Sequence, residues 1–254
     1  MKLVKYVFLD ILRSKILIAY AVFLIAISSG LFMISAEPVK AITSLLNIVL
    51  IVLPLFSVVF ASSYYYNAYE FTELILAQPI KRSTLFFSQF VGVGAALSLS
   101  FIFGCGIPVL IFFRDSSALI LLCCGLALTW VFTAIAFLAV VYARDKTKGI
   151  GIALLLWFYF VFIYDALVLL FLFNFSNYPL EKMLMMLTFL NPVDLTRIIM
   201  LMQLDMAAIM GYTGALFTQF LGSSTGLVWC FFALLLWIAV PFILAQRKFT
   251  RKDI

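Results

Sequence analysis

Residues 42–62 read ITSLLNIVLIVLPLFSVVFAS, a run of 21 residues without a charged side chain. An α-helix rises about 1.5 Å per residue, so this run is long enough to cross the roughly 30 Å hydrocarbon core of a bilayer. The whole chain has the same character, because 66% of its 254 residues are hydrophobic and only 11% are charged. Soluble domains are closer to half apolar and a quarter charged. The sequence therefore predicts an all-α integral membrane protein.

Six runs of this kind are expected to form membrane-spanning helices within one transmembrane domain, residues 1–254. The first is expected to be retained, because the SAEPVK that follows it lacks a small-x-small cleavage pattern. The predicted spans are Ile16–Ser35, Ile42–Ser62, Leu85–Phe113, Ala118–Tyr142, Ile150–Phe173 and Leu227–Ala245.

The third run is longer than a bilayer requires. It also contains helix-disfavouring or small residues, namely Gly92, Gly94, Gly104, Gly106 and Pro108. We expect this helix to be tilted, kinked or closely packed against a neighbour.

Lysine and arginine are distributed unevenly over the two sides of the predicted bundle. Of the 17 basic residues, 13 fall on the side that holds both termini. The remaining four, on the other side, are Lys40, Arg114, Lys182 and Arg197. The positive-inside rule therefore predicts that both termini are cytoplasmic. This topology accounts for the net charge of +6, so the charge does not imply a nucleic-acid partner.

Residues 1–15 predict an amphipathic helix ahead of the first span. Its apolar face would consist of Val4, Val7, Phe8, Ile11 and Leu12. We expect an elbow helix that lies in the cytoplasmic interface, and the alternative is a frayed start to the first span.

Most kinds of catalytic site are disfavoured by the residues that are missing. The sequence has no histidine, and its four cysteines show no paired spacing typical of zinc, so they are interpreted as small packing residues. It contains no G-x-x-x-x-G-K-[ST] motif and no pair of acids within the spans. A non-catalytic membrane subunit is expected.

Asp165, in the stretch FIYDALVLL, is the only acid well inside a predicted span. A carboxylate at this depth costs about 2.5–3.5 kcal/mol on insertion scales, so it should face the bundle interior, a cavity or a partner. One interpretation is a substrate-path or gating residue. The other is a structural anchor through an interhelical hydrogen bond, with Tyr164 as a nearby candidate.

The longest segment outside the predicted spans is 174–226, on the outer side. Its middle, NPVDLTRIIMLMQLDMAAIM, begins like a helix, with Asn191 as the N-cap, Pro192 in the first position and Asp194 in the first turn. Three charges, those of Asp194, Arg197 and Asp205, argue against a seventh span. We expect a helix that is on the outer surface or partly re-entrant.

Methionine is concentrated in the same segment, where seven of the nine lie between residues 183 and 210. Met202, Met206 and Met210 recur every four residues, which places them on one face of a helix. Thioether sulfur is a ligand suited to Cu(I), so transient copper binding is one interpretation. A pliable apolar packing face is the other.

Between the second and third spans, residues 69–83 read YEFTELILAQPIKRS. The TELILA portion predicts a short cytoplasmic helix that ends before Pro79. Such a helix, held between two spans, acts as a lever if another protein docks on it, and is otherwise an inert turn.

The stretch ELILAQPIKRS resembles the cytoplasmic coupling segment of ABC-2-type transporter permeases, here placed at residues 64–84. This family implies six spans, an elbow helix, a homodimer, and a separate dimeric ATPase that binds ATP and Mg²⁺. The resemblance places ATPase coupling at Glu70, Glu73, Leu74, Gln78, Pro79, Lys81 and Arg82.

A narrower resemblance is carried by NPVDLTRI, by LDMAAIMGYTGALFTQFLG and by Tyr164–Asp165. These stretches are similar to the permease subunits of nitrous-oxide-reductase maturation transporters. That resemblance implies the bacterial inner membrane and a periplasmic partner that helps to build a copper–sulfur centre. The expected partner contacts are Asn191, Pro192, Asp194 and Arg197.

Other functions stay open at this point. Within the same class, the chain would be an ABC-2 exporter permease for a lipid, drug or peptide. From other classes, it would be an ATPase-independent transporter or an intramembrane enzyme. An independent transporter normally shows internal repeats or several intramembrane polar residues. The sequence shows one intramembrane acid and no clear repeat.

Overall fold

The computed structural model describes residues 2–35, 37–112, 116–143, 145–175, 181–204 and 224–251. Over these ranges the chain is helical and contains no strand. The elements are α1 (Lys2–Leu12), α2 (Lys15–Ile34), α3 (Pro38–Asn67), α4 (Tyr69–Leu76), α5 (Arg82–Phe101), η1 (Ile102–Gly106), α6 (Ile107–Phe112), α7 (Ser116–Tyr142), α8 (Lys146–Phe158), η2 (Tyr159–Ile163), α9 (Tyr164–Asn174), α10 (Glu181–Phe189), α11 (Pro192–Gln203) and α13 (Ser224–Thr250).

Within the described ranges, six helices are long and apolar enough to cross a membrane, so the chain is a multi-pass membrane protein. Every predicted span is confirmed, with ends that differ by a few residues. Several helices continue into their polar flanks. The spans are Lys15–Ile34, Pro38–Asn67, Arg82–Phe112, Ser117–Tyr142, Lys146–Asn174 and Gly226–Thr250.

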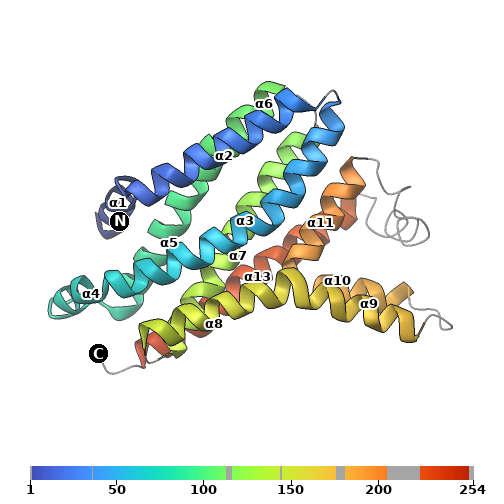
Figure 1. The fold of residues 1–254 in the computed structure, drawn as a ribbon. Coiled ribbons are helices and arrows are strands. Elements are labelled where there is room, and N and C mark those ends of the chain that lie inside the picture. Colours follow the sequence, from blue (N-terminus) through green and yellow to red (C-terminus); the bar gives the residue numbers. More distant parts are fainter. Residues whose placement is uncertain are drawn as a thin grey trace.

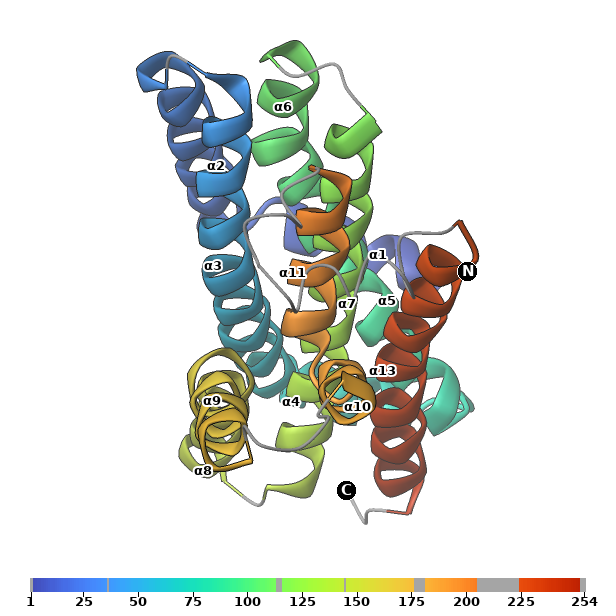
Figure 2. The same ribbon diagram turned by 90° about the vertical axis from the view of Figure 1, so that its right-hand side faces the viewer.

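The short helices α1 and α4 and the C-terminal end of α13 lie at one end of the bundle (Figure 1). Helix α6 and the C-terminal end of α2 lie at the other end. The basic connections of the sequence therefore gather at a single end, which is called the basic end below. Turned by 90°, the same bundle shows α7 and α11 between α3 and α13 (Figure 2).

Helix α7 is the central element of the packing, and it contacts α3, α5, α8, α11 and α13. Its large side chains Phe132 and Phe137 are fully buried. Phe137 packs edge-on against Phe86, Phe90 and Tyr65, from α5 and α3. Aromatic pairs of this geometry contribute about 0.5–1.5 kcal/mol each beyond the area that they bury. The helices at the basic end are thus held by one aromatic cluster.

Two spans contain a π-helical turn in the middle. The third is built from α5, η1 and α6, and the fifth from α8, η2 and α9. In the third, Gly104 lies so close to α2 that an added Cβ would stand 2.6 Å from Leu24 Cβ and 3.0 Å from the carbonyl oxygen of Ala21. Ser28 Oγ also donates to the Gly104 carbonyl at 3.0 Å. The predicted irregularity and close packing of this run are confirmed.

Helix α1 packs along α5 through Val7 and Ile11, which are 0% and 2% exposed. Lys5, Asp10 and Arg13 are exposed, as the amphipathic pattern predicts. The helix stops at Leu12, and α2 begins at Lys15. Residues 2–12 therefore form a separate amphipathic helix and are not the frayed start of α2.

The short helices α10 and α11 meet at an angle of 111°. Together they form a bent pair, which is apolar enough to count as a broken span or as a re-entrant loop. Helix α11 contacts α7, α13, α3 and η2, so it lies inside the bundle. This packing does not fit a helix that lies only on the surface, and the bent pair is either a broken span or a re-entrant loop.

We predict that Gly104→Ala lowers the free energy of unfolding by about 1–3 kcal/mol, because the new methyl group meets a Cβ and a backbone carbonyl that cannot rotate away. The measurement is unfolding of the purified chain in mixed detergent micelles. Gly30→Ala is the matched control, since nothing lies within 4 Å of its Cβ position. Equal losses in both variants would contradict the close packing of η1 on α2.

Candidate functional site

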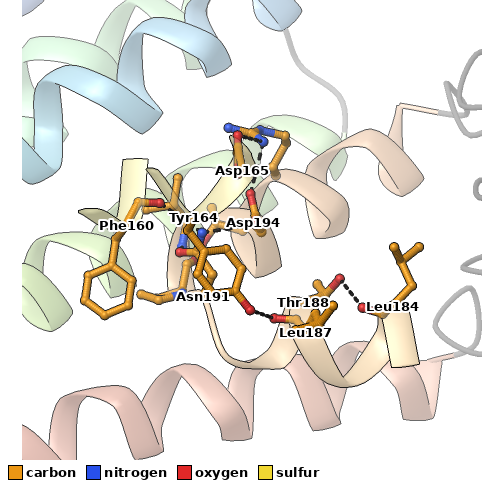
Figure 3. Close-up of polar contacts among 12 residues, drawn as sticks. Phe160, Tyr164, Asp165, Leu184, Leu187, Thr188, Asn191 and Asp194 are labelled. Carbon is orange, nitrogen blue, oxygen red and sulfur yellow. Dashed lines mark hydrogen bonds and ion pairs between the residues drawn. The ribbon is translucent and has the colours of Figure 1, made fainter. Parts of the chain in front are cut away.

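A group of polar contacts joins the α10–α11 pair to the fifth span (Figure 3). The fifth span contributes Phe160, Tyr164 and Asp165, and the bent pair contributes Leu187, Asn191, Asp194 and Arg197. Phe160 is close to the midpoint of Lys146–Asn174, so this site lies at mid-span depth. It is called the mid-span polar site below.

Asn191 organises the turn between the two short helices. Its Oδ1 accepts from the backbone N–H of Val193 at 3.0 Å, which is the N-cap bond, and Pro192 occupies the first helical turn. Its Nδ2 donates to the Phe160 carbonyl at 2.9 Å and to Asp194 Oδ2 at 3.0 Å. The side chain is fully buried. The predicted N-cap is confirmed, and the same residue also ties α11 to η2.

Arg197 lies between two carboxylates. Its Nη1 stands 2.7 Å from Asp165 Oδ2 on α9 and 3.0 Å from Asp194 Oδ1 on its own helix. The side chains of Arg197 and Asp165 are about one third exposed, and that of Asp194 is 15% exposed. A single guanidinium thus neutralises part of two acids, and the group carries a net negative charge when both are ionised.

These contacts revise two expectations. Asp165 is anchored between helices, but its partner is Arg197, while the Tyr164 hydroxyl donates to the Leu187 carbonyl at 2.6 Å. Arg197, expected to offer its charge to another protein, already binds two acids of its own chain. Of the expected partner contacts, Asn191 and Pro192 are buried in the bundle.

The C-terminal carbonyls of both short helices are bound by side chains of the spans. The last turn of a helix leaves carbonyls without intrahelical donors. In α10, the Leu187 carbonyl accepts from Tyr164, and the Phe189 carbonyl accepts from Trp237 Nε1 at 3.1 Å. In α11, the Gln203 carbonyl accepts from Ser117 Oγ at 3.2 Å. The bent pair is therefore fixed to α9, α13 and α7.

The second predicted site, the coupling segment, forms a helix at the basic end. Helix α4 ends at Leu76, ahead of Gln78 and Pro79, as predicted. Of the residues predicted to bind the ATPase, Arg82 is partly buried and the others are exposed, namely Glu70, Glu73, Leu74, Gln78, Pro79 and Lys81. Leu74 is 70% exposed, which is unusual for a leucine beyond the expected lipid depth.

A buried hydrogen bond holds α4 against α5. Gln89 Nε2 of α5 donates to Thr72 Oγ1 at 2.8 Å, and these side chains are 1% and 4% exposed. Phe71 stacks on Tyr6 of α1 with the ring centroids 5.7 Å apart. The charged face of α4 is thus presented outward on a fixed base.

Of the three methionines predicted to share a helix face, the structure describes Met202, on α11. This helix ends at Gln203, so the continuous helix expected from Asn191 to Met210 is shorter than predicted. Met202 is partly buried and packs in an apolar cluster with Leu195, Ile198 and Cys230. Met206 and Met210 lie outside the described residues. The position of Met202 agrees with the packing interpretation.

The contacts that were not predicted from the sequence include those of Arg197 with Asp165, Trp237 with Phe189, and Gln89 with Thr72. The first had a usable signal, since an acid within a span requires a cation and Arg197 is a basic residue in an apolar segment. The other two have no local sequence signal, because they join residues of different helices.

Comparison with known proteins gives no assignment: no protein-family model matches the chain, and a search of curated proteins finds no match.

We predict that Arg197→Gln lowers the free energy of unfolding by about 1.5–3 kcal/mol, because it removes charge-assisted hydrogen bonds and leaves two carboxylates side by side. Adding Asp165→Asn should recover part of this loss, with a coupling of about 0.5–3 kcal/mol. The measurement is a double-mutant cycle on the purified chain.

Lys40→Gln is the matched control for this cycle. Lys40 also forms an ion pair, with Glu37 at 3.2 Å, but both side chains are exposed. Its loss should change stability by no more than about 0.5 kcal/mol. Additive effects of the Arg197 and Asp165 substitutions would show that the two side chains are not energetically coupled.

Proposed function

We propose that the chain is the membrane subunit of an ABC-2-type transporter, which couples ATP hydrolysis in a separate cytoplasmic subunit to work across the membrane. The observation that carries this proposal is α4. It is a short helix between two spans, it exposes Glu70, Glu73 and Leu74, and it is tied to α5 by a buried hydrogen bond. An exposed apolar side chain next to two acids suits a protein-docking surface.

The proposed orientation places α4 on the ATPase side. Helix α4 lies at the basic end of the bundle, together with α1 and the end of α13 (Figure 1). Exposed basic side chains at this end include Lys5, Arg13, Lys15, Lys81, Lys146, Lys148 and Lys248. The positive-inside rule assigns such an end to the cytoplasm. Helix α1 would then be the interfacial elbow helix, and the α10–α11 pair would enter from the extracytoplasmic side.

In the proposed mechanism, the spans transmit motion from α4 at the basic end of the bundle to the α10–α11 pair. A push on α4 reaches α5 through Thr72 and Gln89, and α5 packs on α7 and α13. Helix α7 contacts α11 along its other half, and Ser117 of α7 binds the end of α11. Motion of α4 therefore has a path of direct contacts to the α10–α11 pair. The subunit itself needs no catalytic group for this role, because ATP and Mg²⁺ would be bound by the ATPase dimer.

The narrower proposal is a role in maturing the copper–sulfur centre of nitrous oxide reductase. It rests on the sequence resemblance of NPVDLTRI and of Tyr164–Asp165. The mid-span polar site contains both of these stretches and fixes the bent pair to the fifth span. In this role the chain would work as a homodimer and transmit force to a periplasmic partner. Purifying the native complex tests both levels, since an ATPase alone supports only the general exporter.

We predict that Glu73→Lys lowers membrane-dependent ATP hydrolysis about tenfold or more, because a reversed charge in a docking surface juxtaposes like charges. The measurement is ATP hydrolysis by the complex reconstituted in vesicles, with insertion checked by cysteine labelling.

Glu37→Lys is the matched control, since Glu37 is exposed and lies at the opposite end of the bundle. It should leave hydrolysis unchanged. If a correctly inserted Glu73→Lys complex hydrolyses ATP at the normal rate, α4 is not the docking helix.

We also predict that replacing Met202, Met206 and Met210 together by leucine leaves maturation of the copper enzyme intact. Leucine keeps the volume and apolarity of methionine, usually at under about 1.5 kcal/mol per site. The measurement is copper bound per reductase molecule. A variant that assembles normally while the reductase lacks its copper–sulfur centre would mean that these thioethers handle the metal.

A further inference from the structure

A cleft of about 340 Å³ opens at the basic end between α1, the start of α2, the end of α3 and α4. Its lining includes Tyr6, Asp10, Ser14, Tyr64, Asn67 and Phe71. This α1–α4 cleft is separate from the mid-span polar site and from the outward face of α4. Its volume is at the small end of the range for ligand sites, which fits a group of headgroup size.

The lining of the cleft favours a cation. It contains one carboxylate, that of Asp10, and neither lysine nor arginine. None of the ion pairs found among the described residues involves Asp10. Four aromatic side chains line the same space: Phe60 belongs to its apolar side, described below, and the other three are Tyr6, Tyr64 and Phe71. Aromatic faces attract cations. Hydroxyl oxygens at Ser14 and Ser63 add acceptors, which suit an ammonium group that has N–H donors. The amide oxygen of Asn67, also in the lining, already accepts from Lys146 Nζ at 3.0 Å and is not counted among them.

The position of the cleft favours a lipid over a soluble molecule. Ser14 and Ile16 lie at the start of the first span, and Tyr64 and Asn67 lie at the end of the second, so the cleft is at headgroup level. Its bilayer side is apolar, with Ile16 61% exposed and Phe60 beside it. Its polar groups lie beyond this apolar side, toward the basic end. An apolar side next to a polar side matches an amphiphilic ligand.

A phosphate would also find partners next to the cleft. Arg13 and Lys15 flank Ser14 in the sequence, and both side chains are exposed. A headgroup with an ammonium in the cleft would place its phosphodiester near these two cations. The complementary arrangement of one acid inside and two bases at the rim matches a zwitterion.

We propose that the α1–α4 cleft binds the headgroup of an amine-bearing phospholipid, with the primary ammonium on Asp10 among the three aromatic rings. The apolar chains then lie along α2 and α3, beginning at Ile16 and Phe60. A headgroup bound in the cleft contacts both α1 and α4, because Tyr6 of α1 and Phe71 of α4 both line the cleft and stack on each other. The bound lipid thus steadies the base of α4.

The test is native mass spectrometry of the full chain in micelles that contain equal amounts of phosphatidylethanolamine, phosphatidylglycerol and phosphatidylcholine. We expect one phosphatidylethanolamine to be retained in preference to the other two lipids. Asp10→Asn should lower this retention about tenfold, the scale of one charge-assisted hydrogen bond. Tyr64→Leu should lower it as well, while Tyr64→Phe, which keeps the ring, should retain most of the preference.

Asp145→Asn is the matched control, because it removes an exposed acid at the same end outside the cleft, and it should leave retention unchanged. Elution volume and unfolding temperature confirm that each variant is folded. Equal retention of the three lipids, or no effect of Asp10→Asn in a folded variant, overturns the proposal. Saturation by soluble glycerophosphoethanolamine at the same concentration as the lipid would instead make the ligand a soluble amine. ATP hydrolysis plays no part in the assay, so its outcome is independent of the transporter assignment.

Discussion

The bilayer imposes a constraint on any break in a helix at mid-span depth, and the side chain of Asn191 satisfies it here. Without water nearby, each exposed backbone N–H and carbonyl needs a partner within the protein. The turn between α10 and α11 satisfies this need with one amide that caps Val193 and reaches Phe160, with Tyr164 on Leu187, and with Trp237 on Phe189. A bent pair at this depth is stable because Asn191 and two spans, the fifth and the sixth, supply the missing hydrogen bonds.

The charged group beside this turn follows from the same constraint. Asp194 at the start of α11 is favoured by the helix dipole, and Asp165 on the fifth span is costly unless it is paired. Arg197, one turn after Asp194, reaches both. Such a pair is weak evidence for stability, since its desolvation offsets much of the attraction, and its better-supported use is to specify one arrangement of elements. Here it specifies which face of α11 meets α9.

The membrane-spanning helices were predictable from the sequence, because hydropathy and length alone decide them. Local signals were also sufficient for the start of α11 at Asn191 and for the end of α4 before Pro79. The 111° bend was not predictable, since it depends on how α10 and α11 pack on other helices. The Arg197–Asp165 pair was missed because α11 was treated as a surface helix that offers its charge to another protein.

The packing of the bundle also explains why α4 and the mid-span polar site differ in accessibility. At the basic end, the bond from Gln89 to Thr72 holds the base of α4, and none of the ion pairs among the described residues involves Glu70 or Glu73, so these acids face outward. At mid-span depth the opposite holds, because each charge of the polar site is bound by another of the same chain. In the proposed transporter the docking surface is therefore α4, whereas the α10–α11 pair is held by the spans. Force applied at α4 would then move the bent pair only by moving the spans to which it is bonded.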